Sequence, residues 1–161
     1  MRLSNRRRVP VYNFIQTLLW LFLFGGILAY IIEENEINRL GEENLLLIFV
    51  PLLFLVLFYL KGQPIFEYDS DGEALNFKNR NILPFLCKAR NDEFPKYKLI
   101  NYNLISLFLK KKLYITIKSK KNNTITLNYD ISYLTKKEIN DLKFSLNKII
   151  KTNEERNINL K

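Results

Sequence analysis

Two apolar runs near the start of the chain, VYNFIQTLLWLFLFGGILAYII at 11–32 and NLLLIFVPLLFLVLFYL at 44–60, decide its fold. The first has 22 residues and the second 17, all without a charge. At about 1.5 Å per residue, helices of these lengths reach roughly 33 Å and 25 Å, which brackets a bilayer core of about 30 Å. The pattern predicts a transmembrane helical hairpin over 11–60 with an acidic connecting loop at 33–43.

The rest of the 161-residue chain is polar and basic. It divides into a basic N-terminal segment at 1–10, one small domain at 61–152 and a polar tail at 153–161. A domain of that length can bury a single modest core. The chain is therefore predicted to be a membrane hairpin that carries one domain.

Charges flank the two predicted spans unequally. Four arginines precede the first span and Lys61 follows the second, whereas the loop at 33–43 holds five glutamates and only Arg39. The positive-inside rule counts Lys and Arg near the ends of the spans. It predicts that both termini are cytoplasmic and that the loop is exterior. The abundance of Asn, Lys and Ile is typical of an AT-rich bacterial genome, so we expect a multi-pass protein of a bacterial inner membrane.

Other interpretations of the N-terminus fit less well. A cleaved signal peptide has an apolar stretch of about 7–15 residues and an A-x-A-like site. The run at 11–32 is longer and offers no good site. The residues after Arg6–Arg8 do not continue a twin-arginine signal, and there is no cysteine nearby for a lipid anchor.

Small residues lie together in the first span at Gly25, Gly26 and Ala29. Such residues let helix backbones approach closely in lipid. They could pack the first span against the second, which we favour, or against another copy of the chain. Neither span contains an ionisable side chain, which argues against an ion-coupled transporter.

The domain opens with strand and turn signals. Short apolar runs at 65–68 and 74–77 flank Asp-Ser-Asp-Gly, which predicts a β-hairpin. Residues 82–86 are a further strand candidate, confined to an edge by Pro84. The mixed apolar run at 97–109 predicts one bent strand or two short ones.

The second half of the domain has clearer periodicity. Apolar residues alternate over 113–118 and again over 124–129, and the polar link at 119–123 joins them into an antiparallel hairpin with one buried face. Thr135 and Glu138 then form a capping box, flanked by a hydrophobic staple. The helix that follows carries an apolar stripe, which we expect to pack on the sheet: Ile139, Leu142, Leu146, Ile149 and Ile150.

The final hairpin, its short link and the closing helix support a resemblance. The stretches at 113–117 and 131–142 look like the end of the bacterial pleckstrin-homology-like domains that follow paired membrane helices, and the similarity extends over 66–152. The resemblance implies an α+β domain, an antiparallel open barrel closed by a C-terminal helix, and a general binding role.

The domain is strongly basic: together with the polar tail, residues 61–161 hold 20 Lys and Arg against 11 Asp and Glu. Only Gly62-Gln63-Pro64 separates it from the second span, so its lysines could contact anionic lipid or a partner. A solvated face enriched in lysine by genome composition explains them equally well. The candidate contact residues are Lys61, Lys110, Lys111, Lys112, Lys118, Lys120 and Lys121.

Nucleic acid and catalysis are disfavoured. The tyrosines that could stack on bases, Tyr97, Tyr102 and Tyr114, are needed in strands, and no nucleic-acid motif is present. The chain has no histidine, and its single cysteine, Cys87, therefore has no histidine base. The carboxylates of 69–73 fit a turn better than a metal loop, and those of Asp92 and Glu93 complete no constellation. We expect no enzyme activity, cofactor or metal.

Two functions follow from this pattern. The first is a non-enzymatic inner-membrane scaffold or accessory subunit whose domain binds a protein partner beside the membrane, either another membrane protein or a second copy of the chain. The alternative is a ligand-gated two-span effector, similar in architecture to those of antiphage defence, which would sense a small nucleotide signal.

Overall fold

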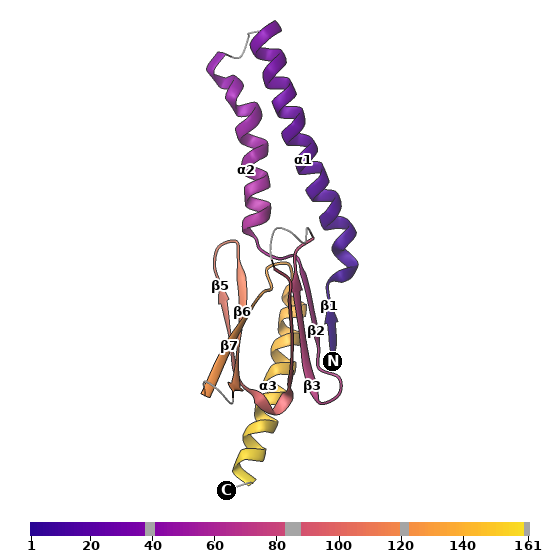
Figure 1. Cartoon of the computed structure of the whole chain (residues 1–161), viewed down its shortest axis with the longest axis vertical. Helices are drawn as coiled ribbons and strands as arrows, with labels where there is room; N and C mark the ends of the chain where they lie inside the picture. The colour runs from indigo at the N-terminus through magenta and orange to yellow at the C-terminus, as the bar shows by residue number, and fades with distance from the viewer. Residues whose placement is uncertain (38–40, 83–87, 120–122, 160–161) are drawn as a thin grey trace. The chain divides into compact units, whose positions relative to one another are not determined.

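The structure is a computed structural model that describes residues 1–37, 41–82, 88–119 and 123–159. The chain forms two compact units. The sheet domain comprises Met1–Val9 and Gly62–Lys161, and the helical hairpin comprises Pro10–Lys61. The hairpin is thus an insertion in the sequence of the sheet domain, which begins before it and resumes after it (Figure 1).

The helical hairpin consists of two long apolar helices linked by short helical turns. Both helices are long and apolar enough to cross a membrane, as the sequence predicts. Only 11% of the most apolar window of each is buried, whereas the core helix of a soluble protein would be mostly buried. The elements are α1 (Val9–Ile32), η2 (Glu33–Ile37), η3 (Gly41–Leu45) and α2 (Leu46–Leu60).

The two helices approach each other closely at Gly26. A Cβ atom on this residue would clash with the carbonyl oxygen of Leu47 and would lie 3.4 Å from Pro51 Cγ. A Cβ atom on Gly25 would meet nothing within 4 Å. Ala29 is half-buried, one turn further along α1. Among the candidate packing residues, Gly26 therefore faces α2 within the same chain, and Gly25 faces open space.

The sheet domain has two antiparallel sheets. The four-stranded sheet has the order β1-β2-β3-β4, and the three-stranded sheet has the order β5-β6-β7. Every neighbouring pair within them is antiparallel. The strands are β1 (Arg2–Ser4), β2 (Ile65–Asp69), β3 (Ala74–Arg80), β4 (Arg90–Pro95), β5 (Leu99–Ser106), β6 (Lys111–Ser119) and β7 (Asn123–Asp130).

Strand β1 was not anticipated from the sequence, which assigned the N-terminal segment no regular structure. Leu3 pairs with Tyr68 in the ladder, and its side chain is only 7% exposed. Asn5 extends the pairing of β1 with β2, because its backbone N–H donates to the Phe66 carbonyl at 3.3 Å. The residues before the first apolar helix are therefore part of the sheet domain.

Three of the predicted strand features are confirmed. β2 and β3 form the first hairpin, with Gly72 at φ 69° in its turn. β6 and β7 pair from Ser119↔Asn123 to Lys112↔Asp130. β5 is a single strand whose register shifts between Leu99 and Asn101, which matches the expected bend.

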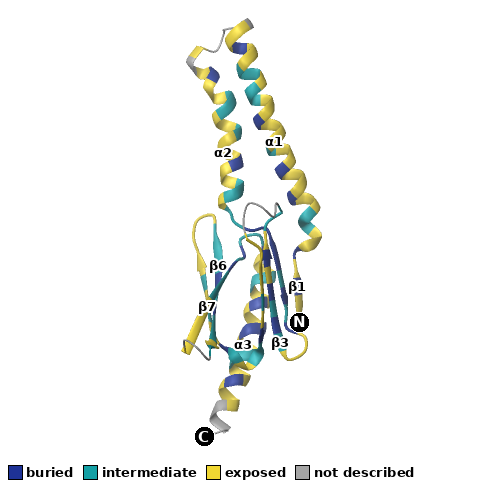
Figure 2. Ribbon diagram, in the orientation of Figure 1, coloured by how far each residue is buried: buried dark blue, intermediate teal, exposed yellow. Residues whose placement is uncertain are grey.

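The third α-helix, α3 (Lys136–Asn159), begins with the predicted capping box. The Glu138 backbone N–H donates to Thr135 Oγ1 at 3.2 Å, and the Thr135 backbone N–H donates to Glu138 Oε2 at 2.7 Å. Leu142 and Leu146 are fully buried, so the apolar stripe packs in the core, as Figure 2 shows along α3. Burying two leucines of this kind contributes roughly 3–6 kcal/mol.

The helix continues beyond its predicted end into the polar tail. Asn153 is only 8% exposed, and its amide nitrogen donates to the Lys96 and Leu99 carbonyls at 2.8 and 3.0 Å. Lys96 belongs to the short η4 turn (Lys96–Lys98) that leads into β5. A buried side chain therefore docks the C-terminal part of α3, where composition alone indicated only a polar segment.

The expected barrel is not closed, which corrects the fold prediction to a coarser α+β arrangement. The described strands form two separate sheets, and side chains join β4 to β7: Tyr129 donates to Asp92 Oδ2 at 2.8 Å, and Arg90 donates to Asn128. β4 itself was missed, because its sequence RNDEFP buries only Phe94. The strand candidate at 82–86 lies largely outside the described residues.

The close approach at Gly26 leads to a prediction. Gly26→Ala should lower the free energy of unfolding of the hairpin by about 1–3 kcal/mol, because the added methyl group overpacks the contact with α2. Gly25→Ala is the matched control and should be neutral or slightly stabilising, because alanine favours the helix and meets open space. Thermal unfolding of the full chain in mild detergent measures both. Equal effects at the two positions would contradict the packing described.

Candidate functional site

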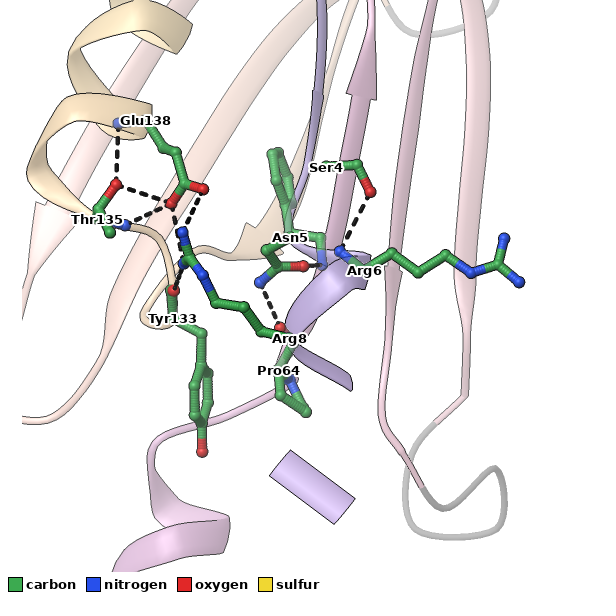
Figure 3. A network of polar contacts seen from close by, with 9 residues as sticks. Ser4, Asn5, Arg6, Arg8, Pro64, Tyr133, Thr135 and Glu138 are labelled. Atoms are coloured by element: carbon green, nitrogen blue, oxygen red, sulfur yellow. Dashed lines mark hydrogen bonds and ion pairs between the residues drawn. The ribbon is translucent and has the colours of Figure 1, made fainter. Parts of the chain in front are cut away.

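The connection between the N-terminal segment and the start of α3 is a network of polar contacts (Figure 3). The Arg8 guanidinium donates to both carboxylate oxygens of Glu138, at 2.7 and 3.2 Å, and to the Tyr133 carbonyl at 3.3 Å. Burial alone would raise the pKa of Glu138, but the hydrogen bonds from Thr135 and the charge of Arg8 outweigh it and hold this pKa below its usual value. The network fixes the chain just before α1 to the capping box of α3.

Two buried asparagines complete the attachment of the strands. Asn5 donates to the Pro64 carbonyl at 2.6 Å and accepts from the Phe66 amide at 2.9 Å. Asn79 donates to the Ile65 carbonyl at 3.0 Å and accepts from the Asp130 amide at 2.7 Å. Because both side chains are nearly fully buried, these bonds are shielded from water. This polar framework is best explained as structural.

The described candidate lysines lie in several segments of the chain rather than in one pocket. Lys110 lies in the turn between β5 and β6, Lys111 and Lys112 begin β6, and Lys118 lies near its far end. Lys61 follows α2 and is half-buried. The remaining candidates, Lys120 and Lys121, lie outside the described residues, as does Cys87.

The carboxylates considered for catalysis serve local structure. Asp69 accepts from the Asp71 amide at 2.9 Å and from Arg2 at 2.9 Å, and the amide contact followed by the guanidinium holds the pKa of Asp69 below its usual value. Asp92 accepts from the Tyr129 hydroxyl, whose pKa is raised by burial and by this carboxylate. Within the described ranges, no three Cys, Asp or Glu side chains lie together as metal ligands.

A surface groove beside α3 was missed by sequence reasoning. This α3 groove, a cavity of about 550 Å³, lies between α3, the turn that joins β2 to β3, and η4. Four of its residues follow one another at four-residue spacing along α3 and are exposed: Phe144, Lys148, Thr152 and Arg156. Residues at this spacing are neighbours on a helix surface, so they form a continuous stripe.

The floor of the α3 groove is already engaged in hydrogen bonds. Ser145 lies 2.9 Å from the Tyr68 hydroxyl and 3.3 Å from Ser70 Oγ. The amide nitrogen of Asn153 donates to two backbone carbonyls. The chemistry the groove offers therefore comes from its rim, where Lys96, Lys148 and Arg156 outnumber the carboxylate of Glu73.

Phe144 is the strongest signal on this rim, because its side chain is 74% exposed. In the sequence Phe144 lies outside the apolar stripe of α3, and this position could have identified it as an exposed aromatic residue. An exposed aromatic ring beside Lys and Arg is typical of the residues that dominate protein interfaces. Comparison of the chain with family models, with curated proteins and with solved structures found no match.

The contact of Arg8 with Glu138 predicts an acid dependence of stability. Because the pKa of Glu138 is depressed in the folded state, its contribution is fully present above the ordinary value of 4.5 and is lost as pH falls through the lower folded value. Arg8→Ala should cost about 1 kcal/mol at neutral pH and less in acid. Thermal unfolding of the full chain between neutral pH and pH values below the ordinary pKa of Glu138 measures this.

The neighbouring Arg7→Ala is the matched control, because Arg7 is exposed. The Arg7→Ala variant should have the same stability as the wild type at every pH. A penalty for Arg8→Ala that does not shrink in acid would show that the ion pair is not its source.

Proposed function

We propose that the protein is a membrane-anchored binding module, acting as a scaffold or accessory subunit whose sheet domain binds a partner protein beside a bacterial inner membrane. The observation that carries the proposal is the insertion of the apolar hairpin between β1 and β2, two paired strands of one sheet. Both ends of the hairpin are therefore tied to the same domain. No enzyme activity is proposed.

This connectivity supports the predicted topology. Because β1 pairs with β2, the residues before α1 and those after α2 belong to one domain, which supports a hairpin that crosses the membrane twice. The sheet domain carries 23 Lys and Arg against 11 Asp and Glu when Met1–Val9 is included with Gly62–Lys161. The positive-inside rule places such a domain in the cytoplasm, with the glutamate-rich loop outside.

The arrangement of the second half of the domain supports the pleckstrin-homology-like interpretation. The β6–β7 hairpin leads through a short link into α3, which packs on the strands with its apolar stripe. This order is what the resemblance implies. It favours binding of a partner at the surface of the domain, because the interior is filled by the domain's own side chains. Leu142 and Leu146, for example, are fully buried.

The α3 groove is the proposed partner site. Its rim offers an exposed phenylalanine flanked by lysine and arginine, which fits an acidic segment that carries an apolar anchor. Small-molecule sites usually enclose most of the ligand surface. Here the stripe from Phe144 to Arg156 is exposed, and the polar groups of the floor are engaged in hydrogen bonds. This geometry favours a protein partner over a nucleotide.

Site-specific photocross-linking in cells tests the proposal. A photoreactive phenylalanine analogue at Phe144 is expected to capture one partner chain in stoichiometric amount. The same analogue at Asn147, which is exposed on α3 but does not line the groove, should not capture it. Lys148→Glu should weaken co-purification about tenfold or more through charge reversal against an acidic segment, whereas Lys151→Glu, outside the groove, should not.

Two outcomes would contradict this function. Purification of the chain alone, with no cross-link from Phe144, would remove the partner site. Saturable binding of a nucleotide to the purified protein, lost in Lys148→Glu and accompanied by membrane depolarisation in cells, would support the gated-effector alternative instead.

A further inference from the structure

The turn between β5 and β6 exposes a cluster of large apolar side chains. In this β5–β6 tip, which comprises Leu107, Phe108, Leu109 and Lys110, Leu107 is 61% exposed and Phe108 is 102% exposed. The turn is closed by a hydrogen bond from the Leu107 amide to the Lys110 carbonyl at 2.7 Å. Figure 2 shows the loop above β6 as exposed. Such a cluster on a tight turn at the surface needs an explanation, because burial of these side chains would be favourable.

The β5–β6 tip lies at the end of the sheet domain where the chain enters from α2. At the base of the tip, the Lys111 carbonyl accepts from the Ile131 amide at 2.8 Å, and the Lys111 amide donates to Ser132 Oγ at 2.9 Å. The neighbouring Asp130 accepts from the Gln63 amide at 3.2 Å. Gln63 lies three residues after Leu60, the last residue of α2. A short chain of contacts thus links the tip to Gln63, where the sheet domain resumes after α2.

Basic residues surround this end of the sheet domain. Lys110, Lys111 and Lys112 follow the apolar residues of the tip directly. Arg6 and Arg7 are exposed beside Asn5, which bonds to Pro64, and Lys136 and Lys137 are exposed at the start of α3, where Arg8 binds Glu138. An apolar tip beside a group of cations matches the two layers of an anionic membrane, with acyl chains beneath acidic headgroups.

We propose that the β5–β6 tip inserts Leu107 and Phe108 into the cytoplasmic leaflet of the membrane that the hairpin spans, with Lys110, Lys111 and Lys112 at the headgroups. The inference rests on the membrane assignment of the hairpin and is independent of partner binding at the α3 groove. It gives the sheet domain a third attachment to the bilayer besides the two chain connections. The groove, which borders the β2–β3 turn at the opposite end of β2, then points away from the membrane.

A lipid occupant accounts for this surface better than a second protein does. The short connection through Gly62-Gln63-Pro64 holds this end of the domain near the headgroups, so the membrane is present at a very high effective concentration. The cations adjoin the apolar tip, so one flat anionic surface can satisfy both.

Fluorescence of the reconstituted full chain tests the proposal. In a Cys87→Ser background, an environment-sensitive probe is attached at Phe108→Cys, and the protein is reconstituted into vesicles of phosphatidylcholine with phosphatidylglycerol. We expect a blue-shifted emission that is quenched by lipids brominated in the upper part of the acyl chain. The control is Ile125→Cys, an exposed apolar position near the opposite end of the three-stranded sheet, where emission should be water-like and unquenched.

A second variant keeps the tip intact and changes only the charges. Replacing Lys110, Lys111 and Lys112 by Gln should lower the ratio of inserted to free tip about fivefold for each lysine in anionic vesicles. In pure phosphatidylcholine the same replacement should have little effect.

Two results would overturn the inference. A water-like emission at position 108 in both vesicle types would show that the tip is free in solution. A blue-shifted emission that brominated lipids do not quench would show that protein, such as a second copy of the chain, covers it.

Discussion

The pairing of β1 with β2 is the constraint on which the rest of the structure depends. Sixty residues separate Ser4 from the start of β2, yet Ser4 and Glu67 are partners in one ladder. The apolar hairpin must therefore leave the sheet domain and return to it. Asn5 and the ion pair of Arg8 with Glu138 reinforce this junction and tie it to α3. Through the short strand β1, the sheet domain holds both ends of the helical hairpin.

The two proposed contacts lie at different ends of the sheet domain. The end that holds the hairpin also carries the β5–β6 tip, where exposed apolar residues adjoin three lysines. The other end carries the α3 groove, where Phe144 lies beside Lys148 and above a floor of engaged polar groups. The proposed lipid contact and the proposed partner contact therefore do not compete for one surface.

The sequence predicted the elements whose periodicity or capping is explicit. The hairpin, the β2–β3 and β6–β7 pairs and the capping box of α3 all followed from local patterns. β1 and β4 did not, because three residues with one leucine and a run of polar residues acquire strand structure only from their neighbours. The α3 groove was also missed, since its walls come from segments far apart in the chain. Phe144, an aromatic residue on the polar face of α3, was the available signal.

Disulfide trapping between β1 and β2 tests the central claim most directly. Ser4 and Glu67 lie opposite each other next to the bond from Asn5 to Phe66, in a non-hydrogen-bonded position. Cα atoms of such a pair are about 4.5 Å apart, which suits a disulfide. In a Cys87→Ser background and native membranes, Ser4→Cys with Glu67→Cys should cross-link rapidly, and Ser4→Cys with Asp69→Cys, offset by two residues, should not. Failure of the first pair, or equal reaction of both, would contradict the inserted hairpin.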